Sequence, residues 1–466
     1  MEIVTSCKHE RRHVAVFTFP FSSHPPLLLA LVRRLASACP WVVFSFFGTE
    51  KSNRALFSNL VISCDNILPY NVSDGVPDDY VFVGKPQEGI NLFLEVAKEE
   101  LNKGVKMAEE DIGLKVSCLV VDIFLWFSAD IAHEMNVPWV AFWTAAAGSL
   151  SAHFYTDHIR QKCAQLKGSV GPDDEMEDLI PGLPVVRLGD LPRGVVLGDL
   201  TSPFSTLLLE MGRNLARAAA VGINSFKELE PDVTEDLSSK LKRVLNVGPL
   251  NLISAPKSSS IHDDGYSCIS WLEDKSPRSV AYIAFGTVCN LPPQELVALA
   301  EALEDTKISF MWSIKNDSKK YFPKGFLERI STNGMGKIIP WAPQVQVLEH
   351  SAIAAFVTHC GWKSVIESIG AGVPMICRPF FGDQQMNTWM VEKVWGIGVR
   401  VQGGSLTKHG MIHALEQVLS LDGSSKSRLM ERVEALKDLA HKAVGPDGSS
   451  SQNFKTLVDV VMGATV

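Results

Sequence analysis

The stretch that decides the fold runs from Trp341 to Gln384 and reads WAPQVQVLEHSAIAAFVTHCGWKSVIESIGAGVPMICRPFFGDQ. Its apolar segment Ala354 to Val357 predicts a buried strand, and a helix is expected to begin after it, at Lys363 and Ser364. A second apolar segment, Val373 to Cys377, predicts another strand. Strand, helix and strand in this order are typical of a parallel sheet with helices on its faces.

The polar residues of this stretch have the chemistry of a nucleotide-sugar site. The start of a helix behind a strand offers free N–H groups and a positive dipole end to a pyrophosphate. Glu367, one turn further on, can accept hydrogen bonds from ribose hydroxyls. Asp383 and Gln384, after the second strand, are suited to the hydroxyl-rich face of a sugar.

Apolar runs alternate with helical patterns along the rest of the chain. The runs predicted as strands are Val14 to Phe19, Val42 to Phe47, Val116 to Val121, Trp139 to Trp143, Val280 to Phe285, Phe310 to Ile314 and Ile338 to Ile339. Helical patterns include Leu27 to Ala38, Glu295 to Leu303 and His409 to Leu419. Near-continuous apolar strands separated by helices predict an α/β protein whose parallel sheets are covered on both faces.

With 466 residues, the chain is longer than one compact core usually supports, so two domains are expected. Val244 to Leu250 looks like a strand leading to a linker, Ile253 to Asp264, which is rich in Ser, Pro and charge. We therefore predict doubly wound domains over residues 1–249 and 250–450, facing each other across a cleft. Ligands of such sheets bind at the carboxyl ends of the strands.

Composition excludes several other classes. The net charge of −8 and the pI near 5.9 disfavour a nucleic-acid partner. The nine cysteines form no CxxC pair, and the chain contains no GxGxxG or Walker A motif, which disfavours a dehydrogenase or a nucleoside triphosphatase. The charged first residues lack a signal sequence, and no apolar run has the length of a membrane span. A cytoplasmic, monomeric protein without membrane insertion or a metal cofactor is expected.

Two residues at predicted strand ends form a candidate catalytic pair. His24 follows the first strand, and Asp122 follows Val121. Histidine has a suitable pKa for a general base, and a carboxylate beside it can hold one tautomer and stabilise the imidazolium. By position alone, His24 could equally be structural and Asp122 a helix cap.

At the residues from Trp341 to Gln384 the sequence resembles the plant secondary-product glycosyltransferases, which use a UDP-sugar donor. The resemblance extends from about His13 to Val461. It implies the GT-B fold, with two Rossmann-like domains and a C-terminal helix, within residues 451–466, that crosses back to the first domain. His24 and Asp122 match the catalytic pair of that family.

The resemblance assigns a set of residues to the donor. These are Ser23, Thr144, Thr287, Trp341, Ala342, Gln344, His359, Trp362, Lys363, Ser364, Glu367, Asp383 and Gln384. Within this set, Trp341 would stack on uracil, and the Ala342 backbone and the Gln344 side chain would read its edge.

Other residues of that set are expected to bind the phosphates and the sugar. His359, Thr287 and Ser364 would bind phosphate, and Trp362 and Asp383 would face the hexose. The alternative for each residue is structural, with Trp341 in the core, Ser364 as a helix cap and Asp383 in a turn.

Two positions bear on the choice of sugar. Gln384 is the usual residue of glucose users in the family, whereas His there often accompanies galactose, so UDP-glucose is expected. Thr144 matches a residue of the first domain that contacts the 6-hydroxyl region of the sugar.

Lys363 departs from the family, which has Asn there. Lysine could pair with phosphate, or it could turn to Glu367, four residues along, and divert that carboxylate from ribose. The third alternative is a natural or engineered lesion. A weakened or altered donor site is favoured over an improved one.

The acceptor side resembles the members that glycosylate the 3-hydroxyl of flavonols and anthocyanidins. A planar polyphenol would fit a slot lined by Phe124, Phe204 and Phe381, with Gln87 and His153 contacting its hydroxyls. A packed helix histidine is the alternative for His153.

The resulting hypothesis is an inverting UDP-glucose-dependent flavonoid 3-O-glucosyltransferase with His24 as base. The alternatives are another donor (galactose, a pentose or rhamnose), another phenolic acceptor, or a nucleotide-sugar binder impaired by Lys363.

Overall fold

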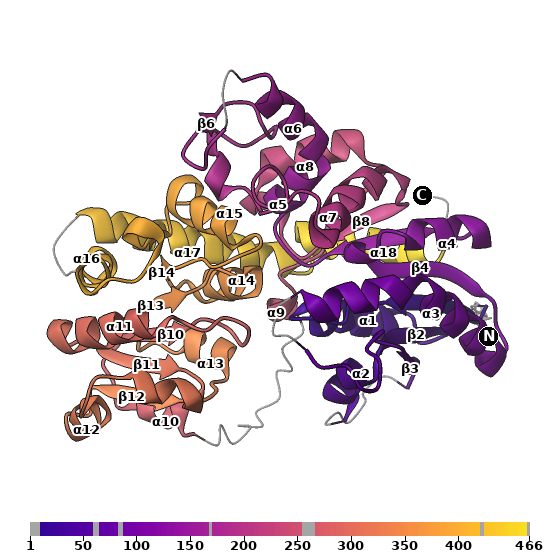
Figure 1. Ribbon diagram of the computed structural model, residues 1–466. Coiled ribbons are helices and arrows are strands. Elements are labelled where there is room, and N and C mark those ends of the chain that lie inside the picture. The colour runs from indigo at the N-terminus through magenta and orange to yellow at the C-terminus, as the bar shows by residue number, and fades with distance from the viewer. Residues whose placement is uncertain are drawn as a thin grey trace, which may run out of the picture.

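The computed structural model describes residues 10–58, 65–82, 87–166, 170–253, 266–419 and 424–463. Two parallel sheets form the two halves of the molecule, one in indigo and purple and the other in orange and yellow in Figure 1. Most of the expected linker, Ile253 to Asp264, lies outside the described residues.

The first sheet has seven parallel strands in the order β3-β2-β1-β4-β5-β8-β9. They are β1 (Arg12–Phe17), β2 (Val42–Thr49), β3 (Ile67–Val72), β4 (Val116–Asp122), β5 (Trp139–Trp143), β8 (Ala220–Ile223) and β9 (Val244–Asn246). Every residue of β2 and β5 is buried, because helices cover both faces of the sheet.

The helices of this half connect successive strands or form the segment between β5 and β8. They are α1 (His24–Ala38), α2 (Glu50–Phe57), α3 (Glu88–Ile112), α4 (Ser128–Met135), α5 (Ala147–Phe154), α6 (Thr156–Ala164), α7 (Pro203–Asn214) and α8 (Pro231–Lys240). A short hairpin of β6 (Glu175–Met176) and β7 (Val186–Arg187) follows α6.

The second sheet has six parallel strands in the order β12-β11-β10-β13-β14-β15. They are β10 (Val280–Ala284), β11 (Ser309–Ser313), β12 (Gly336–Ile339), β13 (Ile353–Thr358), β14 (Met375–Cys377) and β15 (Gly398–Arg400). The helices of this half are α9 (Leu250–Ile253), α10 (Cys268–Glu273), α11 (Pro293–Thr306), α12 (Phe326–Thr332), α13 (Gln344–Glu349), α14 (Trp362–Ala371), α15 (Gln384–Trp389), α16 (Lys408–Leu419) and α17 (Ser424–Val444).

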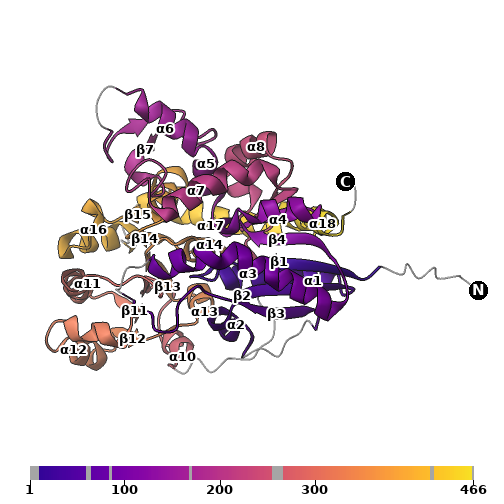
Figure 2. The same cartoon turned by 45° about the vertical axis from the view of Figure 1, so that its right-hand side comes forward.

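The last helix, α18 (Ser449–Val461), packs on the sheet of the first half. Figures 1 and 2 both show this yellow helix among the purple elements. Phe454 and Leu457 are buried in the same hydrophobic cluster as Val14 and Val16 of β1. The chain therefore returns to the half in which it began.

The structure corrects several details of the sequence-based elements. Val244 to Leu250 is not one strand, since β9 ends at Asn246 and α9 begins at Leu250. The apolar pattern does not predict β3, because Pro69 interrupts the apolar run. Proline is tolerated there because β3 is an edge strand. The pattern also does not predict β8 and β15, which are only four and three residues long.

None of the helices in the described part of the chain is long and apolar enough to cross a bilayer.

Candidate functional site

His24 and Asp122 lie together at the carboxyl edge of the first sheet. Because β1 and β4 are neighbours, the segments that follow them meet at this edge. Asp122 is the last residue of β4, and His24 is the first of α1, where Pro25 is tolerated in the first turn. His24 Nδ1 is 2.7 Å from Asp122 Oδ2.

The surroundings of the pair fix one imidazole orientation. The Asp122 side chain is fully buried, and its second oxygen accepts a hydrogen bond from the backbone N–H of Phe124 at 3.2 Å. With Nδ1 directed at the carboxylate, Nε2 is the nitrogen that can take a proton. The pair can therefore act as a base whose cationic form the buried Asp122 stabilises.

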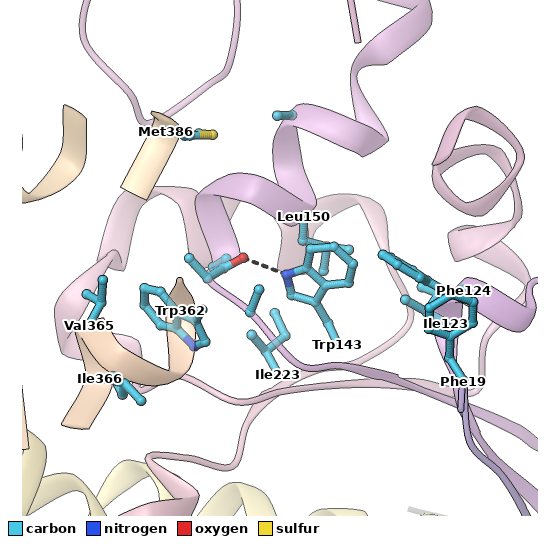
Figure 3. Close-up of a cluster of buried hydrophobic side chains, with 14 of the residues drawn as sticks. Phe19, Ile123, Phe124, Trp143, Leu150, Ile223, Trp362, Val365, Ile366 and Met386 are labelled. Carbon is cyan, nitrogen blue, oxygen red and sulfur yellow. Dashed lines mark hydrogen bonds between the residues drawn. The ribbon is translucent and has the colours of Figure 1, made fainter. Parts of the chain in front are cut away.

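Aromatic rings line one side of the imidazole. The His24 ring is 4.7 Å from the Phe124 ring and 5.2 Å from the Phe19 ring, centroid to centroid. Phe124 also contacts Phe204 at 6.0 Å and Trp143 at 5.9 Å. Figure 3 shows Phe19 and Phe124 side by side, with Trp143 beyond them. This aromatic wall, made of Phe19, Phe124, Phe204 and Trp143, suits a flat apolar ligand.

Of the residues expected at the acceptor, Phe124, Phe204 and His153 belong to this region. His153 contacts Trp143 at 5.7 Å and is only 3% exposed. Burial lowers the pKa of His153 to about 4, so the ring is neutral at pH 7. Its Nδ1 has no hydrogen-bond partner within the described ranges.

Gln87 and Phe381 lie apart from that group. Gln87 precedes α3, Phe381 follows β14, and both are exposed. In the part of the chain that the structure describes, no ring contact or hydrogen bond joins either side chain to the aromatic wall.

The start of α14 lies at the carboxyl end of β13, one residue earlier than the sequence pattern suggests. Its N-cap is Gly361, and no side chain caps the helix, which leaves backbone N–H groups of the first turn for a ligand. Ser364 is therefore not the cap.

His359 packs against two glycines beside this helix start. A Cβ at Gly361 would lie 2.5 Å from His359 Nε2, and one at Gly286 would lie 3.1 Å from the same atom. Burial lowers the pKa of His359 to about 4, so a neutral imidazole faces the site. It can donate one hydrogen bond without adding a charge.

A hydrogen-bond network joins the expected uracil and ribose residues. The Gln344 amide donates to Glu367 Oε2 at 2.7 Å and to Ser364 Oγ at 3.2 Å, and it accepts from the Tyr282 hydroxyl at 3.4 Å. Burial raises the pKa of Glu367, while Lys363 and Gln344 oppose that shift. Tyr282, at the end of this network, was not singled out in the sequence.

Lys363 turns toward Glu367. Its Nζ is 3.8 Å from Glu367 Oε1, and its side chain is 53% exposed whereas that of Glu367 is 2% exposed. The ammonium group thus lies over the carboxylate expected to hold ribose. Lys363 therefore adopts the second expected arrangement, in which it turns to Glu367.

The remaining nucleotide residues differ in accessibility. Trp341 is 56% exposed, so its interpretation as core is wrong, and its ring face is open for stacking. Thr287 is also exposed, whereas Ala342 and Thr144 are buried. Ser23 is half-buried immediately before His24.

Asp383 and Gln384 are fixed from within their own loop. Asp383 Oδ2 accepts from Asn387 at 3.0 Å, and Asn387 also donates to the Cys360 carbonyl at 3.0 Å. Gln384 Oε1 accepts from the backbone N–H groups of Phe380 and Phe381, at 2.8 and 3.2 Å. Only the amide NH₂ of Gln384 is left to act on a ligand, and it lies beside the thiol of Cys289.

Asn387 was missed in the sequence. It lies four residues after Asp383, one helical turn along α15, and that spacing was the available signal.

Trp362 connects the two halves. It is 4% exposed, and its indole N–H donates to the Asn224 carbonyl at 2.8 Å. The indole N–H therefore forms its hydrogen bond with the first half.

His24 of the first half and Asp383 of the second half lie close enough for their charges to interact. Burial raises the pKa of Asp383, and the nearby charge of His24 is among the effects that oppose the shift. The two strand-end sites thus belong to one region.

Across the described ranges no group of three His, Cys, Asp or Glu side chains could hold a metal ion.

Comparisons with known proteins agree with this geometry. Residues 251–443 match the family model described as UDP-glucoronosyl and UDP-glucosyl transferase. The chain is 51% identical to an anthocyanidin 3-O-glucosyltransferase of Vitis vinifera, over 96% of this chain and 97% of the relative. It is equally 51% identical to an anthocyanidin 3-O-galactosyltransferase of Rhododendron delavayi, over 97% and 98%.

A solved structure shows the same fold. The crystal structure of a UDP-glucose: anthocyanidin 3-O-glucosyltransferase in complex with UDP superposes with a TM-score of 0.90 at 40% identity, covering 97% of this chain and 99% of that one.

Proposed function

The chain belongs to the plant UDP-glycosyltransferase family, and from this we propose that it transfers glucose from UDP-glucose to the 3-hydroxyl of a flavonol or an anthocyanidin. Relatives named as flavonoid 3-O-glycosyltransferases, about half identical over nearly the full chain, support the reaction class. The aromatic wall beside His24 supports a flat phenolic acceptor.

The observation that carries the mechanism is the hydrogen bond between His24 and the buried Asp122. A phenolic hydroxyl, with a pKa of about 10 as in Tyr, is mostly un-ionised at pH 7 and needs a base to become nucleophilic. His24 Nε2 takes that proton, while Asp122 holds Nδ1–H and stabilises the imidazolium. The freed oxygen attacks the anomeric carbon from the face opposite UDP and gives a β-glucoside.

The leaving UDP carries the developing negative charge. In this proposal the first turn of α14, the neutral His359, Ser364 and Thr287 stabilise its phosphates through hydrogen bonds. Trp341 stacks on uracil, and Glu367 accepts from ribose, which shares its oxygens with Gln344. The reaction needs no metal in this scheme.

The choice of sugar rests on Gln384. Relatives named as glucosyl- and galactosyltransferases are equally similar to this chain, at 51% each, so overall identity does not separate them. We assign glucose on Gln384, whose NH₂ group is left for a sugar hydroxyl.

We assign the two substrates to different domains. Residues 1–249 bind the acceptor and residues 250–450 bind the donor, and residues 451–466 include the helix that returns to the first domain. A cytoplasmic monomer is the proposed state of the enzyme.

The second candidate is a nucleotide-sugar binder with little turnover. The ion pair of Lys363 with Glu367 favours it, because it occupies the carboxylate that would bind ribose.

Product analysis distinguishes these functions. Purified protein is incubated with UDP-glucose, UDP-galactose, a UDP-pentose or UDP-rhamnose, with a flavonol or with the matched flavone that lacks the 3-hydroxyl. We expect a hexoside from UDP-glucose and the flavonol and no product from the flavone. A galactoside or pentoside as the main product would refute the glucose assignment, and no glycoside from any donor would favour the binder.

The catalytic pair is tested in the same assay. We expect His24→Ala and Asp122→Asn to lower kcat by about 10²- to 10⁴-fold, the usual contribution of a positioned base. His133→Ala, an exposed histidine on α4, is the control and should leave kcat unchanged. Wild-type rates in His24→Ala, with folding verified by circular dichroism, would exclude His24 as the base.

A further inference from the structure

Glu230 is a buried carboxylate at the junction of the two halves that the proposed mechanism does not use. Its Oε2 accepts from the backbone N–H of Ala147 at 2.9 Å, and its Oε1 accepts from that of Gly148 at 2.8 Å. The residue is 4% exposed. No cation pairs with it within the described ranges.

Glu230 supplies a helix cap that the local sequence lacks. The N-cap position of α5 is Ala146, which has no side-chain acceptor for the first N–H groups. Glu230 provides two accepting oxygens at the start of the helix, from more than eighty residues away in the chain. Burial raises the pKa of Glu230 to about 7, and the two N–H groups oppose that rise.

The helix that it caps carries His153 and begins shortly after Trp143 and Thr144. Thr144, proposed to contact the sugar, lies three residues before α5, and His153, proposed to contact the acceptor, lies in its last turn. Trp143 of the aromatic wall is tied to the same helix start, because its indole N–H donates to the Ala146 carbonyl at 2.8 Å, as Figure 3 shows. A shift of α5 would therefore move all three side chains.

The donor half also packs against the contact between Glu230 and the start of α5. A Cβ added to Gly148 would lie 2.6 Å from Glu230 Oε1 and 3.3 Å from the Met386 side chain, so only glycine admits both neighbours. Met386 lies on α15, two residues after the proposed sugar residue Gln384. In Figure 3 its side chain points toward the α5 region from the donor half.

Two further hydrogen bonds hold the segment that contains Glu230. The Trp395 indole donates to the Leu229 carbonyl at 3.3 Å, and the Trp362 indole donates to the Asn224 carbonyl at 2.8 Å. Asn224 also donates through its amide to the Thr144 carbonyl at 3.5 Å. The segment from Asn224 to Glu230 thus contacts the donor half on one side and the α5 region on the other.

We propose that Glu230 is a positioning residue for sugar transfer, which aligns α5 with the donor half and so places Thr144, Trp143 and His153 around the reacting groups. The inference rests on the proposed function. Misalignment by about 1 Å can cost about 100-fold in rate without loss of binding, because the reacting atoms must be close and in line. Glu230 itself touches neither substrate in this scheme.

The test is Glu230→Gln, which keeps the shape but presents an NH₂ group to a backbone N–H. Three quantities are measured: kcat, KM for UDP-glucose, and the number of glycosides formed per UDP released, which reports transfer against hydrolysis by water. We expect kcat to fall at least tenfold and the glycoside yield per UDP to fall, while KM for UDP-glucose stays within about twofold. Glu230→Asp, which keeps the charge, should recover part of the yield.

The matched control is Glu228→Gln in the same segment. Glu228 accepts from Ser449 of α18 at 3.0 Å and does not bond to α5, so all three quantities should match the wild type. If Glu230→Gln fails to fold, Met386→Ala tests the contact of the donor half with the start of α5. This variant should also lower the glycoside yield per UDP.

A folded Glu230→Gln with a lower melting temperature but wild-type kcat and yield would make Glu230 a structural cap only and overturn the inference. Where Met386→Ala is used instead, an unchanged glycoside yield per UDP would also overturn the inference. A wild type that transfers sugar to no acceptor overturns the proposed function and the inference with it. An active wild type with an unaffected Glu230→Gln overturns the inference alone.

Discussion

Lys363 pairs with a buried carboxylate of the proposed donor site. Its ammonium group is 3.8 Å from a carboxylate that is otherwise bonded to Gln344. Glu367 is buried, so it depends on these two partners for compensation of its charge. In the proposed mode, ribose hydroxyls would share the Glu367 oxygens with these two partners.

We predict that Lys363→Asn lowers KM for UDP-glucose by roughly two- to fivefold, the range expected for a partly exposed ion pair, and leaves kcat little changed. Initial rates over a series of donor concentrations measure this change. Lys363→Met is the control that removes the charge without supplying an amide. A donor KM unchanged in both variants would mean that position 363 does not limit donor use, and a KM that rises would indicate that lysine binds phosphate.

At the residue scale, the His24–Asp122 contact could be expected from the sequence, because Asp122 directly follows one predicted strand and His24 follows another after a short segment. Adjacent parallel strands bring their carboxyl ends together, and the observed 2.7 Å contact is a consequence of that geometry. The hydrogen-bond partners of Gln384 could not be predicted from the sequence in this way. Its bonds to Phe380 and Phe381 depend on the local path of a loop, which apolar periodicity does not report.

At the scale of elements, α18 links the chain terminus to the first sheet. The Phe454 ring is 8% exposed, and the Arg34 guanidinium carbon is 3.7 Å from its centroid. Burial lowers the pKa of Arg34 to about 10, because the low-dielectric surroundings disfavour its charge. Asn453 adds a hydrogen bond to the Asn246 carbonyl at 3.0 Å.

Phe454→Ala is expected to lower the free energy of unfolding by about 3–5 kcal/mol, the usual cost of removing a buried phenylalanine ring. Urea denaturation followed by circular dichroism measures the change. Lys455→Ala, at the exposed neighbouring position, serves as the control and should behave as the wild type. Equal midpoints for both variants would show that α18 contributes little to the stability of the first half.

At the scale of the whole molecule, a buried ion pair joins the halves at a second place. Arg400 of β15 lies 2.7 Å from Asp190, and the two side chains are only 16% and 3% exposed. Asp190 is also bonded by Arg187 of its own half, at 3.0 and 3.1 Å. The pair therefore connects the edge of the second sheet to the segment that follows the β6–β7 hairpin.

Arg400→Met should destabilise the protein by about 1–3 kcal/mol, less than for an isolated buried pair because Asp190 keeps Arg187. Chemical denaturation gives the loss of stability, and loosening of the halves should appear as a lower kcat for sugar transfer. Arg329→Met is the matched control, since Arg329 pairs with Glu304 on the surface of one half, and it should leave both quantities unchanged. Wild-type stability and rate in Arg400→Met would show that the two halves do not depend on this pair.

The sequence by itself determined the α/β class, the family, and which residues stand at the strand ends that form the candidate site. It could do so because apolar periodicity, strand ends and helix starts are local properties of the chain. Only the tertiary structure decided that Glu230 caps α5, that Trp362 donates to Asn224, and that Lys363 lies over Glu367. The first two contacts join residues far apart in the chain, and the third depends on a side-chain rotamer. Neither long-range packing nor rotamer choice leaves a periodic mark in a single sequence.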